Sequence, residues 1–90
     1  MTMETAQSKV NQRTLNLKLY RIIRKMGVPR SDVQLPATLT FDLGFDSYDM
    51  NIFLFYLEAF FNIEITDNEI PKLQTIEHTI HFLEQKLQAA

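Results

Sequence analysis

The chain has 90 residues, which is enough for one domain with a single modest hydrophobic core. It contains no cysteine, which excludes a disulfide framework and any metal site built on thiolate ligands. No apolar run approaches the roughly 20 residues of a membrane-spanning helix, and the N-terminus lacks the apolar stretch of a signal peptide. The sequence therefore predicts a cytoplasmic protein without a membrane span.

The net charge of −2 is distributed unevenly. Residues 1–30 hold seven basic side chains and one carboxylate, a net of +6, whereas residues 31–90 hold two lysines and ten carboxylates, a net of −8. Such asymmetry can mark a nucleic-acid-binding arm. Here the basic residues are interleaved with apolar residues at helical spacing, and the acidic remainder would repel a phosphate backbone. We therefore expect a solvated helix face and no nucleic-acid partner.

The chain begins with an expected flexible tail over residues 1–7, followed by one domain over residues 8–90. The first helix should begin between Ser8 and Thr14 and end at Gly27, a residue typical of helix C-termini. Its apolar residues recur with a period of 3.6 residues, which predicts one buried stripe. The stripe consists of Leu15, Leu19, Ile22, Ile23 and Met26.

No sustained periodicity is present over residues 28–45, and Pro29 and Pro36 indicate a long loop there. Within it, the segment from Ser31 to Gln34 fits a capping box and predicts one short helical turn. A loop of this length in a compact domain is uncommon unless it serves a function.

The second helix should run from about Ser47 to Phe61, with Asp46 as N-cap and Asp49 in the first turn, where the helix dipole favours a negative charge. Its apolar side chains gather on one face and predict a phenylalanine-rich core. The expected members on this helix are Met50, Phe53, Leu54, Leu57, Phe60 and Phe61, with Phe41, Phe45 and Phe82 nearby.

Two further helical segments complete the chain. Thr66 and Glu69 match a capping box and predict a short helix that Pro71 limits in length. Thr75 is the expected cap of a last helix, whose stripe is Ile76, Ile80, Leu83 and Leu87. No segment alternates as a strand does, so the sequence predicts an all-α fold of three long helices and one short helix.

The stretch from Phe41 to Asp49 contains the candidate site. It places the hydroxyl of Ser47 in the first turn of a helix, directly after a loop that contains Gly44. Unpaired N–H groups and a partial positive charge at that position favour a phosphate ester. The same residues are also compatible with a serine that only helps to cap the helix, or with ordinary phosphorylation.

A family resemblance bears on these alternatives. The segment Leu43-Gly44-Phe45-Asp46-Ser47-Tyr48-Asp49 resembles the Leu-Gly-x-Asp-Ser-Leu-Asp attachment motif of acyl carrier proteins. The similarity extends without a gap over about residues 15–87. It includes Met26-Gly27-Val28, Phe61-Asn62-Ile63-Glu64-Ile65-Thr66-Asp67 and Leu73-Gln74-Thr75-Ile76. It implies a freestanding carrier with an acyl-carrier-like four-helix bundle, a long first loop and a short third helix.

The resemblance also implies a function without catalysis. A phosphopantetheinyl transferase would move 4′-phosphopantetheine from coenzyme A onto Ser47, using magnesium held by the transferase. The terminal thiol would then carry an acyl group as a thioester to acyl-loading and synthase enzymes. By the same resemblance, Asp46 and Asp49 would help these basic partners to dock, and the carrier would act as a monomer.

The sequence departs from the family pattern along the second helix. Tyr48 replaces the usual leucine, and Ile52 and Ala59 stand where many members are acidic. Opposite the core face there is an apolar stripe of Tyr48, Ile52, Phe55 and Ala59. Either the long loop or a neighbouring helix covers this stripe, or it docks partners. The expected docking residues are Asp46, Tyr48, Asp49, Ile52, Phe55 and Glu58. The pathway stays open between fatty acid, polyketide-like and other specialised lipid synthesis.

Two other functions are compatible with the chain. One is an unmodified helical domain that acts only in protein interaction, and the other is a carrier for an activated amino acid. A metal site is not expected, because the pair His78 and His81 supplies fewer ligands than a protein metal site usually has.

Overall fold

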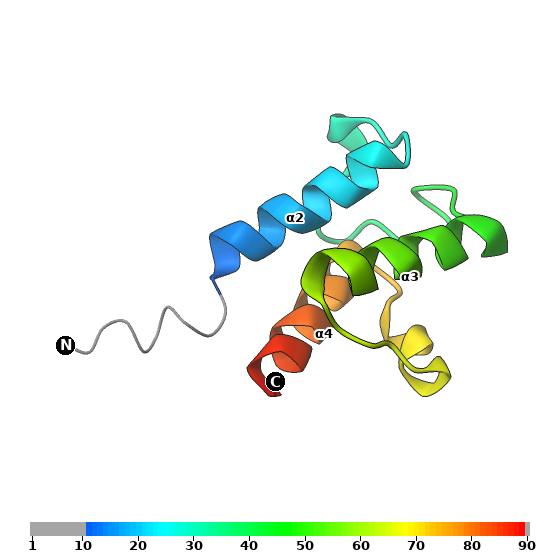
Figure 1. Cartoon of the computed structure of the whole chain (residues 1–90). Helices are drawn as coiled ribbons and strands as arrows, with labels where there is room; N and C mark the ends of the chain where they lie inside the picture. Colours follow the sequence, from blue (N-terminus) through cyan, green and yellow to red (C-terminus); the bar gives the residue numbers. More distant parts are fainter. Residues whose placement is uncertain (1–10, 90) are drawn as a thin grey trace.

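The structure is a computed structural model and describes residues 11–89 (Figure 1). The elements are α2 (Gln12–Lys25), the 3₁₀ turn η1 (Arg30–Asp32), α3 (Ser47–Phe61), the 3₁₀ helix η2 (Asp67–Lys72) and α4 (Ile76–Ala89). Over this part of the chain there is no strand, only an isolated antiparallel bridge between Thr38 and Thr75. The predicted all-α fold with three long helices is confirmed. The predicted tail over residues 1–7 lies outside the described residues.

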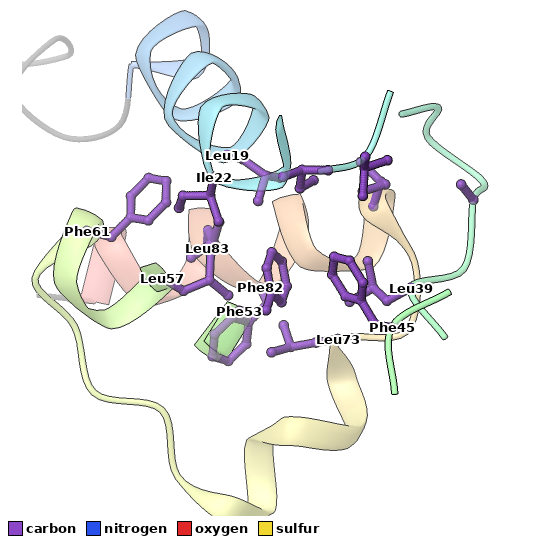
Figure 2. Close-up of a cluster of buried hydrophobic side chains, with 14 of the residues drawn as sticks. Leu19, Ile22, Leu39, Phe45, Phe53, Leu57, Phe61, Leu73, Phe82 and Leu83 are labelled. Carbon is purple, nitrogen blue, oxygen red and sulfur yellow. The ribbon is translucent and has the colours of Figure 1, made fainter. Parts of the chain in front are cut away.

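The three long helices pack around one core, and Figure 2 shows their side chains converging on it. The predicted stripe of α2 is buried from Leu15 to Ile23, whereas Met26 is half-buried. Phe53 and Leu57 of α3 and Leu83 of α4 are fully enclosed. Burying a large apolar side chain stabilises the fold by roughly 1.5–3 kcal/mol, so this shared core is what holds the helices together.

The loop between α2 and α3 is a fixed part of the structure because it is bonded to the start of α4. The backbone N–H groups of Ile76 and Glu77 donate to the carbonyl oxygens of Ala37 and Leu35, at 3.0 and 2.9 Å. These two donors lie in the first turn of α4, where a helix has no acceptors of its own. The loop thus supplies acceptors to the first turn of α4, and the same hydrogen bonds fix the path of the loop toward the beginning of α3.

The helix η2 is attached to α4 by an ion pair. The Lys86 ammonium donates to both Glu69 carboxylate oxygens, at 2.7 and 2.6 Å. This hydrogen bond, together with one from the Thr66 backbone N–H at 3.0 Å, lowers the pKa of Glu69 from 4.5 to about 2. The predicted capping box of Thr66 and Glu69 is present. Glu69 therefore completes the N-terminal capping box of η2 and also attaches η2 to α4.

The predicted turn at Ser31 to Gln34 is misplaced. The turn spans Arg30–Asp32 with Pro29 at its N-cap, because the ring of Pro29 fixes φ at −64° and leads directly into it. Ser31 consequently lies inside the turn instead of capping it. Its carbonyl oxygen accepts a hydrogen bond from the Gln34 side-chain amide at 3.2 Å.

Two phenylalanines assigned to the core are at the surface. Phe41 is 87% exposed, because its neighbours on the same turn, Leu39 and Phe45, occupy the inward positions. Phe60 is 38% exposed, because a helical step of about 100° turns it away from the buried Phe61. The other predicted members, Phe45, Phe53, Phe61 and Phe82, are buried.

Candidate functional site

A hydrogen-bonded turn brings the chain to the beginning of α3. The Asp42 Oδ2 atom accepts from the Thr38 backbone N–H at 2.8 Å and from the Thr38 hydroxyl at 3.1 Å. The Phe45 N–H donates to the Leu39 carbonyl oxygen at 3.0 Å and closes the turn. Gly44 has a φ of +78°, a left-handed conformation that glycine adopts without strain. Ser47 therefore follows an ordered turn, which Figure 1 shows beside the first residues of α3.

Two carboxylates define where α3 begins. The Asp46 Oδ1 atom accepts from the Asp49 N–H at 2.8 Å, and the Asp49 Oδ2 atom accepts from the Asp46 N–H at 3.2 Å. This reciprocal capping box makes Asp46 the N-cap and Ser47 the first residue of the helix. The cap is therefore supplied by Asp46, and capping does not account for Ser47.

The chemistry at Ser47 fits a phosphate ester. Its side chain is exposed, so a modifying enzyme has access to the hydroxyl. The N–H groups of Ser47 and Tyr48 lie in the first turn, where no intrahelical acceptors exist, and the helix dipole adds a partial positive charge. Both features stabilise an anionic group on the serine oxygen.

The predicted apolar stripe of α3 lies mostly at the surface. Tyr48 and Phe55 are 70% and 65% exposed, and Ala59 is exposed as well. Ile52, between them, is half-buried. The loop thus leaves the two aromatic rings of the stripe open, and their role in docking stays a prediction.

Glu58 has a structural contact that the sequence did not indicate. It is half-buried, and its Oε2 atom accepts from the backbone N–H of Ile65 at 2.8 Å. This bond ties α3 to the segment that leads into η2. No local pattern marks a pair seven residues apart across a helix end, so the contact could not be read from the sequence.

Two other features, a metal centre and a membrane-spanning helix, are absent from residues 11–89. No group of three or more histidine, cysteine, aspartate or glutamate side chains is arranged there to hold a metal ion. The His81 Nδ1 atom lies 3.5 Å from the Glu84 Oε1 atom, but His78 does not join them in a cluster. No helix in this part of the chain is long and apolar enough to cross a membrane.

Comparison with known proteins agrees with the geometry of the site. Residues 19–83 match the phosphopantetheine attachment site family. The chain is 30% identical over 80 residues to an acyl carrier protein of Amoebophilus asiaticus (strain 5a2), covering 89% of this chain and 95% of the relative. It is 32% identical over 81 residues to an acyl carrier protein of Guillardia theta, covering 89% of this chain and all of the relative. A third, from Solidesulfovibrio magneticus, is 32% identical over 65 residues, which are 72% of this chain and 83% of the relative.

The helical fold, the exposed serine at a capped helix start and these matches together define a carrier protein, which holds a group for other proteins and does not itself catalyse. The chain belongs to the acyl carrier protein family. The prosthetic group of this family is covalently bound 4′-phosphopantetheine.

Proposed function

We propose that Ser47 is the attachment residue for phosphopantetheine and that the protein carries acyl groups as thioesters on that arm. The observation that supports this most directly is the division of roles at the start of α3. Asp46 and Asp49 complete the capping box between them, and the Ser47 hydroxyl remains exposed. A free hydroxyl in that position is the group a phosphopantetheinyl transferase needs.

Attachment would make one bond and break one. The Ser47 oxygen forms a new bond to the phosphorus that bears the pantetheine, and the pyrophosphate P–O bond of coenzyme A breaks. The serine proton passes to a base of the transferase, and the nucleotide part of coenzyme A leaves with the bridging oxygen. The product is a phosphodiester whose negative charge lies at the N-terminus of α3, where the dipole is favourable. The terminal thiol of the bound arm supplies the thioester chemistry. The protein's own residues hold the attachment point at the surface.

The partners that we propose are the transferase, acyl-loading enzymes and a synthase, and we place their docking on the outer face of α3. We define the α3 outer face as Tyr48, Ile52 and Phe55, with Asp46 and Asp49 beside Ser47. An exposed apolar centre with a charged border is typical of transient interfaces. Glu58 adds a carboxylate further along the helix, although one of its oxygens already accepts from Ile65.

The pathway that we favour is a specialised one, such as polyketide-like or another dedicated lipid synthesis. The support for this is that Ile52 and Ala59 stand where many members of the family carry acidic residues, so that the exposed side of α3 is less acidic than is usual. An amino acid carried on the same arm would use the same residues and differ only in the cargo.

The test is modification in vitro. The protein is incubated with coenzyme A, magnesium and a broad-specificity transferase, and its intact mass is recorded. We expect a gain of one phosphopantetheine that is absent in Ser47→Ala and retained in Ser31→Ala, a matched change at another exposed serine. No gain with several transferases would reject the carrier and favour the unmodified interaction module.

A further inference from the structure

The outer face of α2 is strongly basic. This helix, Gln12–Lys25, contains no carboxylate, and its exposed side chains include Arg13, Arg21, Arg24 and Lys25. The apolar stripe on the other side is buried against α3 and α4. The remainder of the molecule is acidic, with a net charge of −8 over residues 31–90. The positive charge is thus concentrated on one side of the bundle.

An apolar pocket of about 180 Å³ opens beside this face, between α2, the loop and α4. Its walls are mainly aliphatic and come from all three parts: Leu19, Ile23, Val33, Leu35, Ile76 and Ile80. A cavity of about 150 Å³ lined by such side chains binds benzene. The pocket therefore has the size and polarity to accept one large apolar side chain.

The α2 edge of this pocket carries positive charge. Tyr20 forms part of the lining, and the Arg30 guanidinium lies 5.2 Å from the centroid of its ring. Arg24 lies one helical turn beyond Tyr20 on the same side of α2. Leu35, at the mouth, is 53% exposed. The apolar pocket is thus bordered on its α2 side by Arg24 and Arg30.

This surface faces away from α3. Lys18 of α2 points toward α3, where its ammonium lies 3.5 Å from the Phe60 carbonyl oxygen and 5.5 Å from the centroid of the Phe61 ring. Tyr20 lies about 200° further around the helix axis, on the opposite side. Figure 1 shows α2 along the upper side of the bundle and the first residues of α3 at its right-hand end. A partner bound beside Tyr20 would leave Ser47 accessible.

We propose that this pocket and the basic face of α2 bind a protein that presents one protruding apolar side chain surrounded by carboxylates. The pocket supplies the site for the anchor, and Arg24 and Arg30 supply the complementary charge. A lipid surface fits less well, because the apolar stripe of α2 is buried in the core and cannot enter a bilayer. Glu77 lies next to Ile76 on the α4 side, so the carboxylates of the partner belong on the α2 side. The carrier would thereby bind this partner through α2 while other enzymes act on the arm at Ser47.

The probe for this proposal is a synthetic helical peptide with a central phenylalanine flanked by glutamates. It is titrated into ¹⁵N-labelled protein, and amide shifts are followed by NMR. We expect saturable shifts at Tyr20, Val33 and Ile80, and a peptide with alanine in place of the phenylalanine should bind about tenfold more weakly or worse. Raising the ionic strength to about 1 M, where the Debye length is about 3 Å, should also weaken binding.

Variants of the protein test the two components separately. The double change Arg24→Glu and Arg30→Glu removes the charge complementarity, and Leu35→Asp places a carboxylate at the mouth of the pocket. All three positions are exposed, so the fold should tolerate both variants. Each should weaken peptide binding about tenfold, whereas Lys72→Glu, an exposed lysine on η2, should leave it unchanged.

The proposal is overturned if the shifts fall on Tyr48 and Phe55, or if binding does not depend on the phenylalanine. Equal binding to vesicles of phosphatidylglycerol that competes with the peptide would indicate a lipid surface instead. Self-association in sedimentation that Leu35→Asp abolishes would assign the pocket to a second copy of the chain. Arm attachment to Ser47 is measured on the same variants and should be unaffected, so failure here and failure of the carrier function are distinguishable.

Discussion

The helices α2 and α3 contribute to the same core but leave opposite chemistry on their outer faces. On α2 the exposed side chains include four Arg and Lys residues and no carboxylate, whereas on α3 they include Tyr48 and Phe55. Exposed arginines are ordinary, because charged groups favour water, but neighbouring exposed aromatic rings on one helix call for an explanation. The difference indicates that the two helices have similar structural roles and distinct surfaces for interaction.

The largest expected effect is a difference in stability between a substitution on the buried side of α3 and one on its exposed side. Phe53 is fully buried, with its ring 5.5 Å from that of Phe45, whereas Phe55 is 65% exposed. Phe53→Ala should therefore lower the free energy of unfolding by about 3–5 kcal/mol, and Phe55→Ala by less than about 0.5 kcal/mol. Urea unfolding of the two variants measures both values. Similar losses would mean that the outer ring is part of the packing.

The next effect concerns docking. Tyr48→Ala and Phe55→Ala should each slow acyl transfer to or from a cognate synthase, since loss of a central anchor costs a complex about 2 kcal/mol or more. Salt should change the rate only mildly, because the contact is mainly apolar. Arg21→Ala on α2 is the matched control and should transfer at the normal rate. A melting temperature that falls as in a core truncation would show that the two rings pack and do not dock.

A smaller effect is expected at the start of α3. Asp46→Ala removes the N-cap and should destabilise the protein by about 1 kcal/mol, with faster amide exchange in the first turn of the helix. Ser47→Ala should change stability much less, because the cap belongs to Asp46 and Asp49. If Ser47→Ala were the more destabilising of the two, Ser47 would be a structural residue after all.

The smallest effect concerns pH and the attachment of η2 to α4. The pKa of Glu69 is about 2 in the folded protein and 4.5 ordinarily, so folding favours its ionised form. The ion pair with Lys86 therefore contributes fully above about pH 4.5, and this contribution is lost as the pH falls toward 2. Glu69→Gln should remove that part of the acid dependence and leave α2 unaffected. Unfolding midpoints of both proteins between pH 7 and pH 2 measure the difference.

Local sequence signals predicted the elements that local interactions form. The bounds of α3, from Ser47 to Phe61, agree with the prediction because its cap lies in adjacent residues, Asp46 and Asp49. The period of 3.6 residues in α2 predicted its buried stripe for a similar reason, since one core covers that whole face. The candidate site was predictable because it consists of a helix start and the turn before it.

Long-range contacts could not be predicted in the same way. Nothing in the sequence near Ala37 indicates that its carbonyl oxygen accepts from Ile76, or that Glu58 accepts from Ile65. The exposure of Phe41 depends on Leu39 and Phe45 taking the inward positions of the turn, which apolar character alone does not determine. The pocket beside α2 is likewise formed by three segments that meet only in the folded chain.

The central claim is that the arm is attached at Ser47, and the most direct measurement is to locate the added group in the chain. The modified protein is digested, and the peptide spanning the turn and the first residues of α3 is fragmented in a mass spectrometer. That region contains other hydroxyl groups, those of Thr38, Thr40 and Tyr48, which serve as internal controls. We expect the phosphopantetheine on Ser47 alone. Its presence on any of the other three, or its persistence in Ser47→Ala, would exclude Ser47 as the attachment residue.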